Sequence, residues 1–115
     1  MQPKLRNIAL LTSGGDSPGM NACIRAVVRA SLFHGVKPYG VYDGFNGLIN
    51  DQMKEMKYKD VSNILHSGGT ILGTARCKEF HVPGFRKKAF ENLKSNNIEA
   101  LIAIGGDGTF AGANI

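Results

Sequence analysis

Short apolar stretches at three places in the chain have the pattern of buried strands. The first, from Asn7 to Thr12, reads NIALLT and runs into a serine and two glycines. Residues 37–43, KPYGVYD, alternate apolar positions, and residues 99–104, EALIAI, form another apolar run. An uninterrupted apolar run is typical of a strand buried on both faces, and alternation is typical of strands in general. We therefore predict a strand in each segment.

Between these strands the apolar positions follow the helical period of about 3.6 residues. The period predicts three helices: one that begins at Met20 and stops at Gly35, one that Asp60 caps and that runs through His66, and one that begins near Pro83 and closes at Asn96–Asn97. Their inward faces are expected to consist of Ile24, Val27, Val28 and Leu32, then of Val61, Ile64 and Leu65, then of Phe85, Ala89, Phe90 and Leu93. The connector GFNGLIN at 44–50 has room for one helical turn, and residues 70–81 are expected to be irregular.

The order of these elements predicts the fold class. Strand, helix, strand, two helices, strand and the start of another helix indicate an α/β fold, a parallel sheet with helices on both faces. Crossovers between parallel strands are right-handed, so the loops that follow the strands gather at one edge of the sheet. Ligands bind at that edge in sheets of this kind. The 115 residues are expected to form part of one domain.

Composition narrows the classes of function. The net charge is +5, from 14 Lys and Arg against 9 Asp and Glu. A basic balance suits phosphate-bearing ligands, but a solvated surface, or a piece whose acidic remainder lies elsewhere, explains it equally well. No nucleic-acid motif occurs, the two cysteines show no metal spacing, and no apolar run has the length of a membrane span. We expect a cytoplasmic protein without a nucleic-acid or membrane partner.

Two glycine-rich loops carry the chemistry that remains. TSGGDSPGMN at 12–21 and AIGGDGTFAG at 103–112 each follow a predicted strand and precede a helix. Glycine lets backbone N–H groups approach an anion, and the helix that follows adds free N–H donors. The pattern predicts a phosphate cradle at the ligand-binding edge. It is not of the Walker type, because no G-x-x-x-x-G-K-[ST] sequence occurs.

Two charged residues near these loops point to phosphoryl chemistry. Asp107 would repel a bound phosphate unless a cation lay between them, and Mg²⁺ binds one or two carboxylates together with water and phosphate oxygens. An aspartate in a turn or at a helix N-terminus is the alternative. Arg76 ends the segment GGTILGTAR at 68–76, and its planar fork suits phosphate oxygens, although a surface arginine is the alternative here.

Taken together, TSGGDSPGMN, GGTILGTAR and IGGDGT resemble the ATP-dependent 6-phosphofructokinase family, in its bacterial type. The resemblance runs from about Asn7 to the last residue, and YDGFNGL at 42–48 resembles the connector of the family. GGDGT alone would be weak, because diacylglycerol kinases and NAD kinases carry it too. The resemblance implies phosphorylation of fructose 6-phosphate by Mg-ATP, with the enzyme assembled as a homotetramer.

The resemblance also implies roles for individual residues. It makes Gly15 the backbone contact to the transferring phosphoryl group, and Arg76 the bridge between the nucleotide phosphates and the sugar phosphate. The nucleotide site would consist of Gly15, Arg76, Cys77, Gly106, Asp107, Gly108 and Thr109. Asp107 would hold Mg²⁺. Glycine at 108 favours ATP, because pyrophosphate-dependent relatives typically carry an aspartate there that crowds the nucleotide.

The helix from Met20 carries a second implied site. Arg25 and Arg29 match residues that help to bind the allosteric effectors ADP or phosphoenolpyruvate at a subunit interface in bacterial members. A pair of solvated arginines is the alternative. Tyr58 stands where bacterial members commonly place an effector-binding arginine, which puts the effector response in doubt. Phe45 replaces a common tyrosine.

One part of the family pattern lies outside this sequence. The general base of the family is an aspartate in a Thr-x-Asp-Asn-Asp motif, which these 115 residues do not contain. We therefore expect the chain to be the N-terminal, nucleotide-binding part of a phosphofructokinase, inactive by itself. A lipid or NAD kinase-like enzyme, or a truncated non-catalytic nucleotide-binding module, remains an alternative at this point.

Overall fold

The computed structural model describes residues 6–13, 20–62, 64, 70–73 and 83–105. These residues form a four-stranded sheet in the order β3-β2-β1-β4. The strands are β1 (Asn7–Ser13), β2 (Lys37–Val41), β3 (Met53–Glu55) and β4 (Ala100–Gly105), and the helices are α1 (Met20–Phe33), α2 (Phe45–Ile49), α3 (Tyr58–Val61) and α4 (Pro83–Ser95). The predicted strands and the predicted start of α1 are thereby confirmed, as is the helical turn in the connector.

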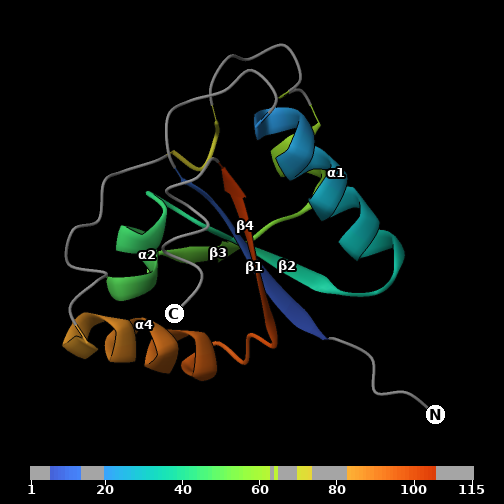
Figure 1. Ribbon diagram of the computed structural model, residues 1–115. Coiled ribbons are helices and arrows are strands. Elements are labelled where there is room, and N and C mark those ends of the chain that lie inside the picture. Colours follow the sequence, from blue (N-terminus) through green and yellow to red (C-terminus); the bar gives the residue numbers. More distant parts are fainter. Residues whose placement is uncertain (1–5, 14–19, 63, 65–69, 74–82, 106–115) are drawn as a thin grey trace.

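Helices cover both faces of this sheet (Figure 1), as the sequence predicts. Alternate residues of β1 point to opposite faces, so Leu10 and Leu11 belong to different core clusters, and both are fully buried. Leu10 packs in the cluster that contains Ile24 and Val28 of α1, and Leu11 in the cluster that contains residues of α2 and α4. Burial on both faces explains why the β1 sequence is apolar without interruption.

The sheet is mixed, which corrects the prediction of a parallel one. β1 pairs in parallel with β2 and with β4, but β3 pairs antiparallel with β2. The helical turn of α2 sends the chain back, and the N–H of Gln52 donates to the carbonyl of Gly47 while the N–H of Tyr42 donates to that of Gln52. β3 has only three residues, MKE, which is too short for a period to be detected.

The sequence predicts that Asp60 caps a helix at its N-terminus, and this prediction is wrong in detail. Lys57 occupies the N-cap of α3, and Asp60 lies in the first turn, where its carboxylate accepts the backbone N–H of Lys57 at 2.8 Å. This hydrogen bond, and the positive charge of Lys54, hold the pKa of Asp60 below its usual value. Because the pKa of Asp60 is lowered, its ionised carboxylate stabilises the folded state at neutral pH. This stabilisation is lost as the pH falls through that pKa. Leu65 and His66 lie outside the described residues.

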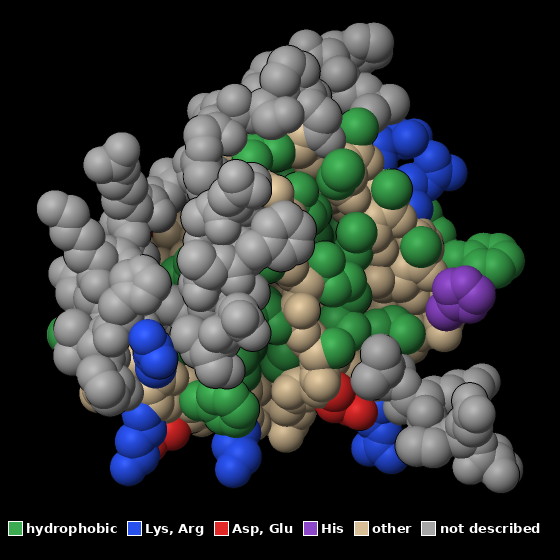
Figure 2. All heavy atoms as spheres, viewed as in Figure 1, with side chains coloured by type: hydrophobic (Ala, Val, Ile, Leu, Met, Phe, Trp, Pro, Cys, Tyr) green, Lys and Arg blue, Asp and Glu red, His purple; other side chains and the backbone are tan. Residues whose placement is uncertain are grey.

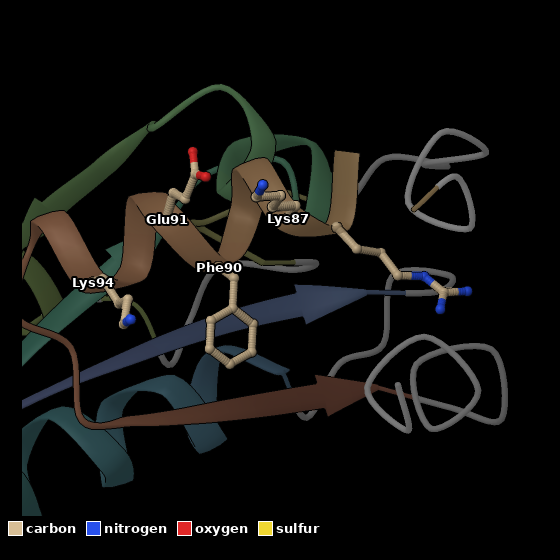
Figure 3. Close-up of a pocket in the computed structure, with 5 residues that line it drawn as sticks. Lys87, Phe90, Glu91 and Lys94 are labelled. Carbon is tan, nitrogen blue, oxygen red and sulfur yellow. The ribbon is translucent and has the colours of Figure 1, made fainter. Parts of the chain in front are cut away.

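The predicted inward face of α4 is partly wrong. Ala89 is buried and Leu93 packs against the core, but 65% of Phe90 and 39% of Phe85 are exposed. Asn92 sets the rotation of the helix, because its side-chain amide donates to the carbonyls of Leu48 at 2.7 Å and Ile49 at 3.0 Å, at the end of α2. Phe90 lines a surface cavity of about 410 Å³ with Lys87, Glu91 and Lys94, among others (Figure 3), and it also borders a cavity of about 320 Å³ with Leu93 and Leu101.

Among the described residues β4 is the last strand on its side of the sheet, and its residues are only partly buried. Figure 2 shows hydrophobic side chains gathered on the viewed face, with lysine and arginine side chains toward its rim.

The predicted helix ends are confirmed at Gly35 (φ 75°) and Asn97 (φ 57°), both in the left-handed region. No helix in the described parts of the chain is both long enough and apolar enough to cross a membrane.

Two glycines offer a matched test of the packing of α2. A Cβ at the buried Gly47 would collide with the carbonyl oxygen of Tyr42 and lie 2.8 Å from the side chain of Val41. A Cβ at Gly84, in α4, would meet nothing within 4 Å. We expect Gly47→Ala to lower the free energy of unfolding by about 2–3 kcal/mol, since backbone must move to make room. Gly84→Ala should leave stability unchanged or raise it by up to about 1 kcal/mol. Urea unfolding measures both, and equal stability of the two variants would contradict the close packing at Gly47.

Candidate functional site

The two glycine loops begin at neighbouring positions of the sheet. β1 and β4 pair in parallel with Thr12 opposite Ile104 and Ser13 opposite Gly105, at the carboxyl ends of both strands (Figure 1). The loop from residue 14 and the loop from residue 106 therefore start side by side. This confirms that both glycine motifs leave the sheet at the same edge. Gly15 in the first loop, and Gly106, Asp107, Gly108 and Thr109 in the second, lie outside the described residues.

The third motif reaches the same edge through Thr12. The hydroxyl of Thr12 donates to the carbonyl of Gly73 at 2.9 Å and lies 2.9 Å from the hydroxyl of Thr70. Thr12 is fully buried, although it is the next-to-last residue of β1. The segment Thr70–Gly73 is thus fastened to the end of the central strand.

Two further elements hold this segment. The side-chain carbonyl of Asn21, at the start of α1, accepts the backbone N–H of Ile71 at 2.8 Å, and Asn21 is only 1% exposed. The backbone N–H of Asp43 donates to the carbonyl of Leu72 at 2.9 Å. Segment 70–73 is therefore held by β1, by α1 and by the turn after β2. Arg76 and Cys77, which follow three and four residues after Gly73, lie outside the described residues.

The beginning of α1 belongs to the same edge. α1 starts at Met20, directly after the first glycine loop, and its second residue, Asn21, contacts segment 70–73. A helix N-terminus carries free N–H donors and the positive end of the helix dipole. Three motif segments and one helix start thus meet at one edge of the sheet, an arrangement suited to an anionic ligand that spans two loops.

The described residues do not by themselves form a metal-binding site. Within ranges 6–13, 20–62, 64, 70–73 and 83–105, no group of three or more His, Cys, Asp or Glu side chains is placed to hold an ion. The candidate carboxylate, Asp107, follows β4 by two residues. A single carboxylate beside a glycine loop fits Mg²⁺, which completes its shell with water and phosphate oxygens.

The two arginines of α1 line one cavity. Arg25, Arg29 and Tyr58 border a surface cavity of about 430 Å³, together with Phe33 and alanines of α1. The Nε of Arg25 is buried and has no hydrogen-bond partner in the described part of the chain. Tyr58 and Phe33 are 54% and 81% exposed. The structure therefore brings together the pair that the sequence singles out and the tyrosine that departs from the pattern.

Sequence reasoning missed the residues that fasten segment 70–73, namely Thr12, Asn21, Asp43 and Thr70. Two of them carry a signal in the sequence. Thr12 closes an apolar strand with a hydroxyl, and Asn21 shares a helical face with Ile24 and Val28, three and seven residues on. A polar side chain on an apolar face must find a hydrogen-bond partner, and here the partner is a distant segment.

Comparisons with known proteins show which family this chain is similar to. The family described as Phosphofructokinase matches residues 7–115. A relative from Halalkalibacterium halodurans, named ATP-dependent 6-phosphofructokinase, is 56% identical over 109 residues, which are 95% of this chain and 34% of the relative. The chain thus spans about a third of the length of the curated relatives it matches.

Solved structures of two phosphofructokinases have the same fold. The structure of Pichia pastoris phosphofructokinase in the T-state superposes with a TM-score of 0.92 at 49% identity, over 99% of this chain and 12% of that one. A pyrophosphate-dependent phosphofructokinase from Marinobacter aquaeolei superposes with a TM-score of 0.82 at 19% identity, over 96% of this chain and 28% of that one, a likeness of fold alone. Neither a lipid kinase nor an NAD kinase finds support among these relatives. Since the family match spans residues 7–115 and more than half of the residues are shared with a named relative, the chain belongs to the phosphofructokinase family.

Proposed function

We propose that the protein of which this chain is the N-terminal, nucleotide-binding part phosphorylates fructose 6-phosphate with Mg-ATP. The observation that carries the proposal is the meeting of three motif segments at one sheet edge, where Ser13 lies opposite Gly105 and Thr12 binds segment 70–73. The 56% identity to a relative named ATP-dependent 6-phosphofructokinase supports the choice of substrates. The reaction belongs to glycolysis, and we expect the protein in the cytoplasm.

The roles proposed for the residues rest on the resemblance to the family and agree with the chemistry of their side chains and backbone. The backbone N–H of Gly15 contacts the phosphoryl group in transfer, and Arg76 binds oxygens of both the nucleotide and the sugar phosphate through its planar fork. Asp107 holds Mg²⁺, which neutralises charge on the transferring phosphates when it is bound. Gly106, Gly108, Thr109 and Cys77 complete the nucleotide site. The proton of the attacking hydroxyl goes to a general base that these 115 residues do not contain.

Donor choice cannot rest on the fold. The Marinobacter protein is pyrophosphate-dependent by name and has the same fold at a TM-score of 0.82. The proposal for ATP rests instead on Gly108, where a side chain would crowd the nucleotide.

The first prediction therefore concerns the donor. The full-length protein should turn over fructose 6-phosphate with Mg-ATP and at most weakly with pyrophosphate. Gly108→Asp should lower kcat/KM for ATP by about 100-fold or more, because an added carboxylate costs both space and charge beside the phosphates. Steady-state assays with each donor measure this. Turnover with pyrophosphate but not with ATP would refute the proposed donor.

The second prediction concerns Asp107. Asp107→Asn keeps the shape and removes the charge, so kcat should fall by about 100-fold or more while the KM for fructose 6-phosphate changes little. Asp60→Asn is the matched control, because Asp60 loses a charge in α3 while its side-chain oxygen still accepts the N–H of Lys57. Wild-type kcat of Asp107→Asn at saturating Mg-ATP would leave Asp107 as a turn residue.

The third prediction concerns the arginine cavity. We propose that Arg25 and Arg29 bind the phosphate of ADP or phosphoenolpyruvate at an interface of the homotetramer, with Tyr58 leaving the site one cation short. Arg25→Ala should raise the ADP concentration for half-maximal effect by about tenfold or more, since a charge-assisted hydrogen bond contributes about 1.5–3 kcal/mol. Lys94→Ala, on the outside of α4, is the control. An unchanged ADP dependence in Arg25→Ala would mean that these arginines are only solvated.

A further inference from the structure

The hydroxyl groups of Thr12 and Thr70 form a network whose proton positions are fixed. A threonine hydroxyl has one proton to donate. Thr12 donates its proton to the carbonyl of Gly73, so across the 2.9 Å between the two hydroxyls Thr70 must be the donor. Thr70 in turn accepts the backbone N–H of Leu72 at 3.2 Å. Every proton in this network has an acceptor, and the network spans both ends of segment 70–73.

The burial of Thr12 indicates that its hydroxyl serves this contact. Thr12 is fully buried at the end of a strand whose other interior residues are apolar. Valine has almost the same shape and fits strands as well, so packing alone gives no reason for a hydroxyl there. A buried hydroxyl costs stability unless it is hydrogen-bonded, and the bonds of Thr12 go to residues about 60 positions away, as the separations of 58 and 61 residues show.

The contact with Gly73 differs from the other two anchors of the segment. Asn21 and Asp43 hold the backbone of Ile71 and Leu72, in its middle. Thr12 alone among these three holds the carbonyl of Gly73, the last described residue before the chain runs on to Arg76. Gly73 has φ +73°, and a Cβ there would lie 3.0 Å from a carboxylate oxygen of Asp43. Gly73 is thus a left-handed residue whose carbonyl Thr12 binds.

We propose that Thr12 is a positioning residue for Arg76, and that its hydroxyl couples the loop of Gly15 to the segment that bears the arginine. Thr12 precedes Gly15 by three residues, and Gly73 precedes Arg76 by three. One buried hydroxyl therefore joins the end of β1, after which the loop of Gly15 begins, to Gly73, after which the chain runs on to Arg76. The inference rests on the proposed role of Arg76, and it adds a residue that touches neither substrate. A displacement of about 1 Å at a reacting group can cost a factor of about 100 in rate.

The test uses the full-length protein with three substitutions. Thr12→Val removes the hydroxyl and should lower kcat by about 10- to 100-fold, with little change in the KM for either substrate. Thr12→Ser keeps the hydroxyl and should restore most of kcat. Ser31→Ala is the matched control, because it removes a buried hydroxyl that, among the described residues, donates to the carbonyl of Val27 within α1. Wild-type kcat in Thr12→Val would overturn the proposal, as would a loss of kcat in Thr12→Ser as large as in Thr12→Val.

A double-mutant cycle separates positioning from general destabilisation. If Thr12 acts through Arg76, then Thr12→Val should lower kcat much less in an Arg76→Lys background than in the wild type. Additive effects would overturn the proposal. Thr70→Val, which leaves the Thr12 to Gly73 bond in place, should lower kcat less than Thr12→Val does, and it supplies the cycle if Thr12→Val does not fold. Absence of fructose 6-phosphate phosphorylation in the unsubstituted protein would instead refute the proposed function, so the two failures are distinct.

Discussion

The parallel pairing of β1 with β4 is the constraint on which the site depends. Its register places Ser13 opposite Gly105, so two loops that are far apart in the sequence begin at adjacent positions. A register shift of one residue would turn the side chains of β4 to the opposite faces of the sheet. Ile102 and Ile104 would then leave the cluster of α1, and Leu101 and Ala103 would leave the cluster of α2 and α4. The hydrophobic cores on the two faces therefore fix the positions at which the two glycine loops leave the sheet.

The sequence was sufficient to predict β1, β4 and α1, but it did not predict β3 or the exposure of Phe90 on α4. β1 and β4 are uninterrupted apolar runs and α1 has a clear helical period, so their positions followed from the pattern. β3 has three residues and exists because α2 turns the chain back against β2, an effect that no local period records. Phe90 looked like a core residue, but it is 65% exposed, where residues of α4 and β4 border a surface cavity. Both outcomes depend on how segments meet in space, which a local period does not record.

The sequence also indicated only some of the residues of the candidate site. The roles predicted for the glycine loops, for the carboxylate of Asp107 and for Arg76 stay predictions, because these residues lie outside the described part of the chain. The groups that hold segment 70–73 could not be assigned from spacing, because Thr12 and Asn21 find their partners about 50 to 60 residues away. In the sequence, each of these two residues is polar and stands where the surrounding pattern is apolar. Such residues mark the places where a fold fastens one segment to another.

Scaffold and specificity are separable in this part of the fold. The pyrophosphate-dependent protein from Marinobacter aquaeolei superposes with a TM-score of 0.82 although only 19% of residues are identical, so this arrangement of the backbone is kept when most side chains differ. On the proposal made above, side chains in the loops select the donor, at positions such as Gly108. The hydroxyl of Thr12 acts below the loops, at their roots, where it sets their relative position whatever the donor is. A change of donor therefore requires changes in the loops, whereas a change at Thr12 would disturb transfer from any donor alike.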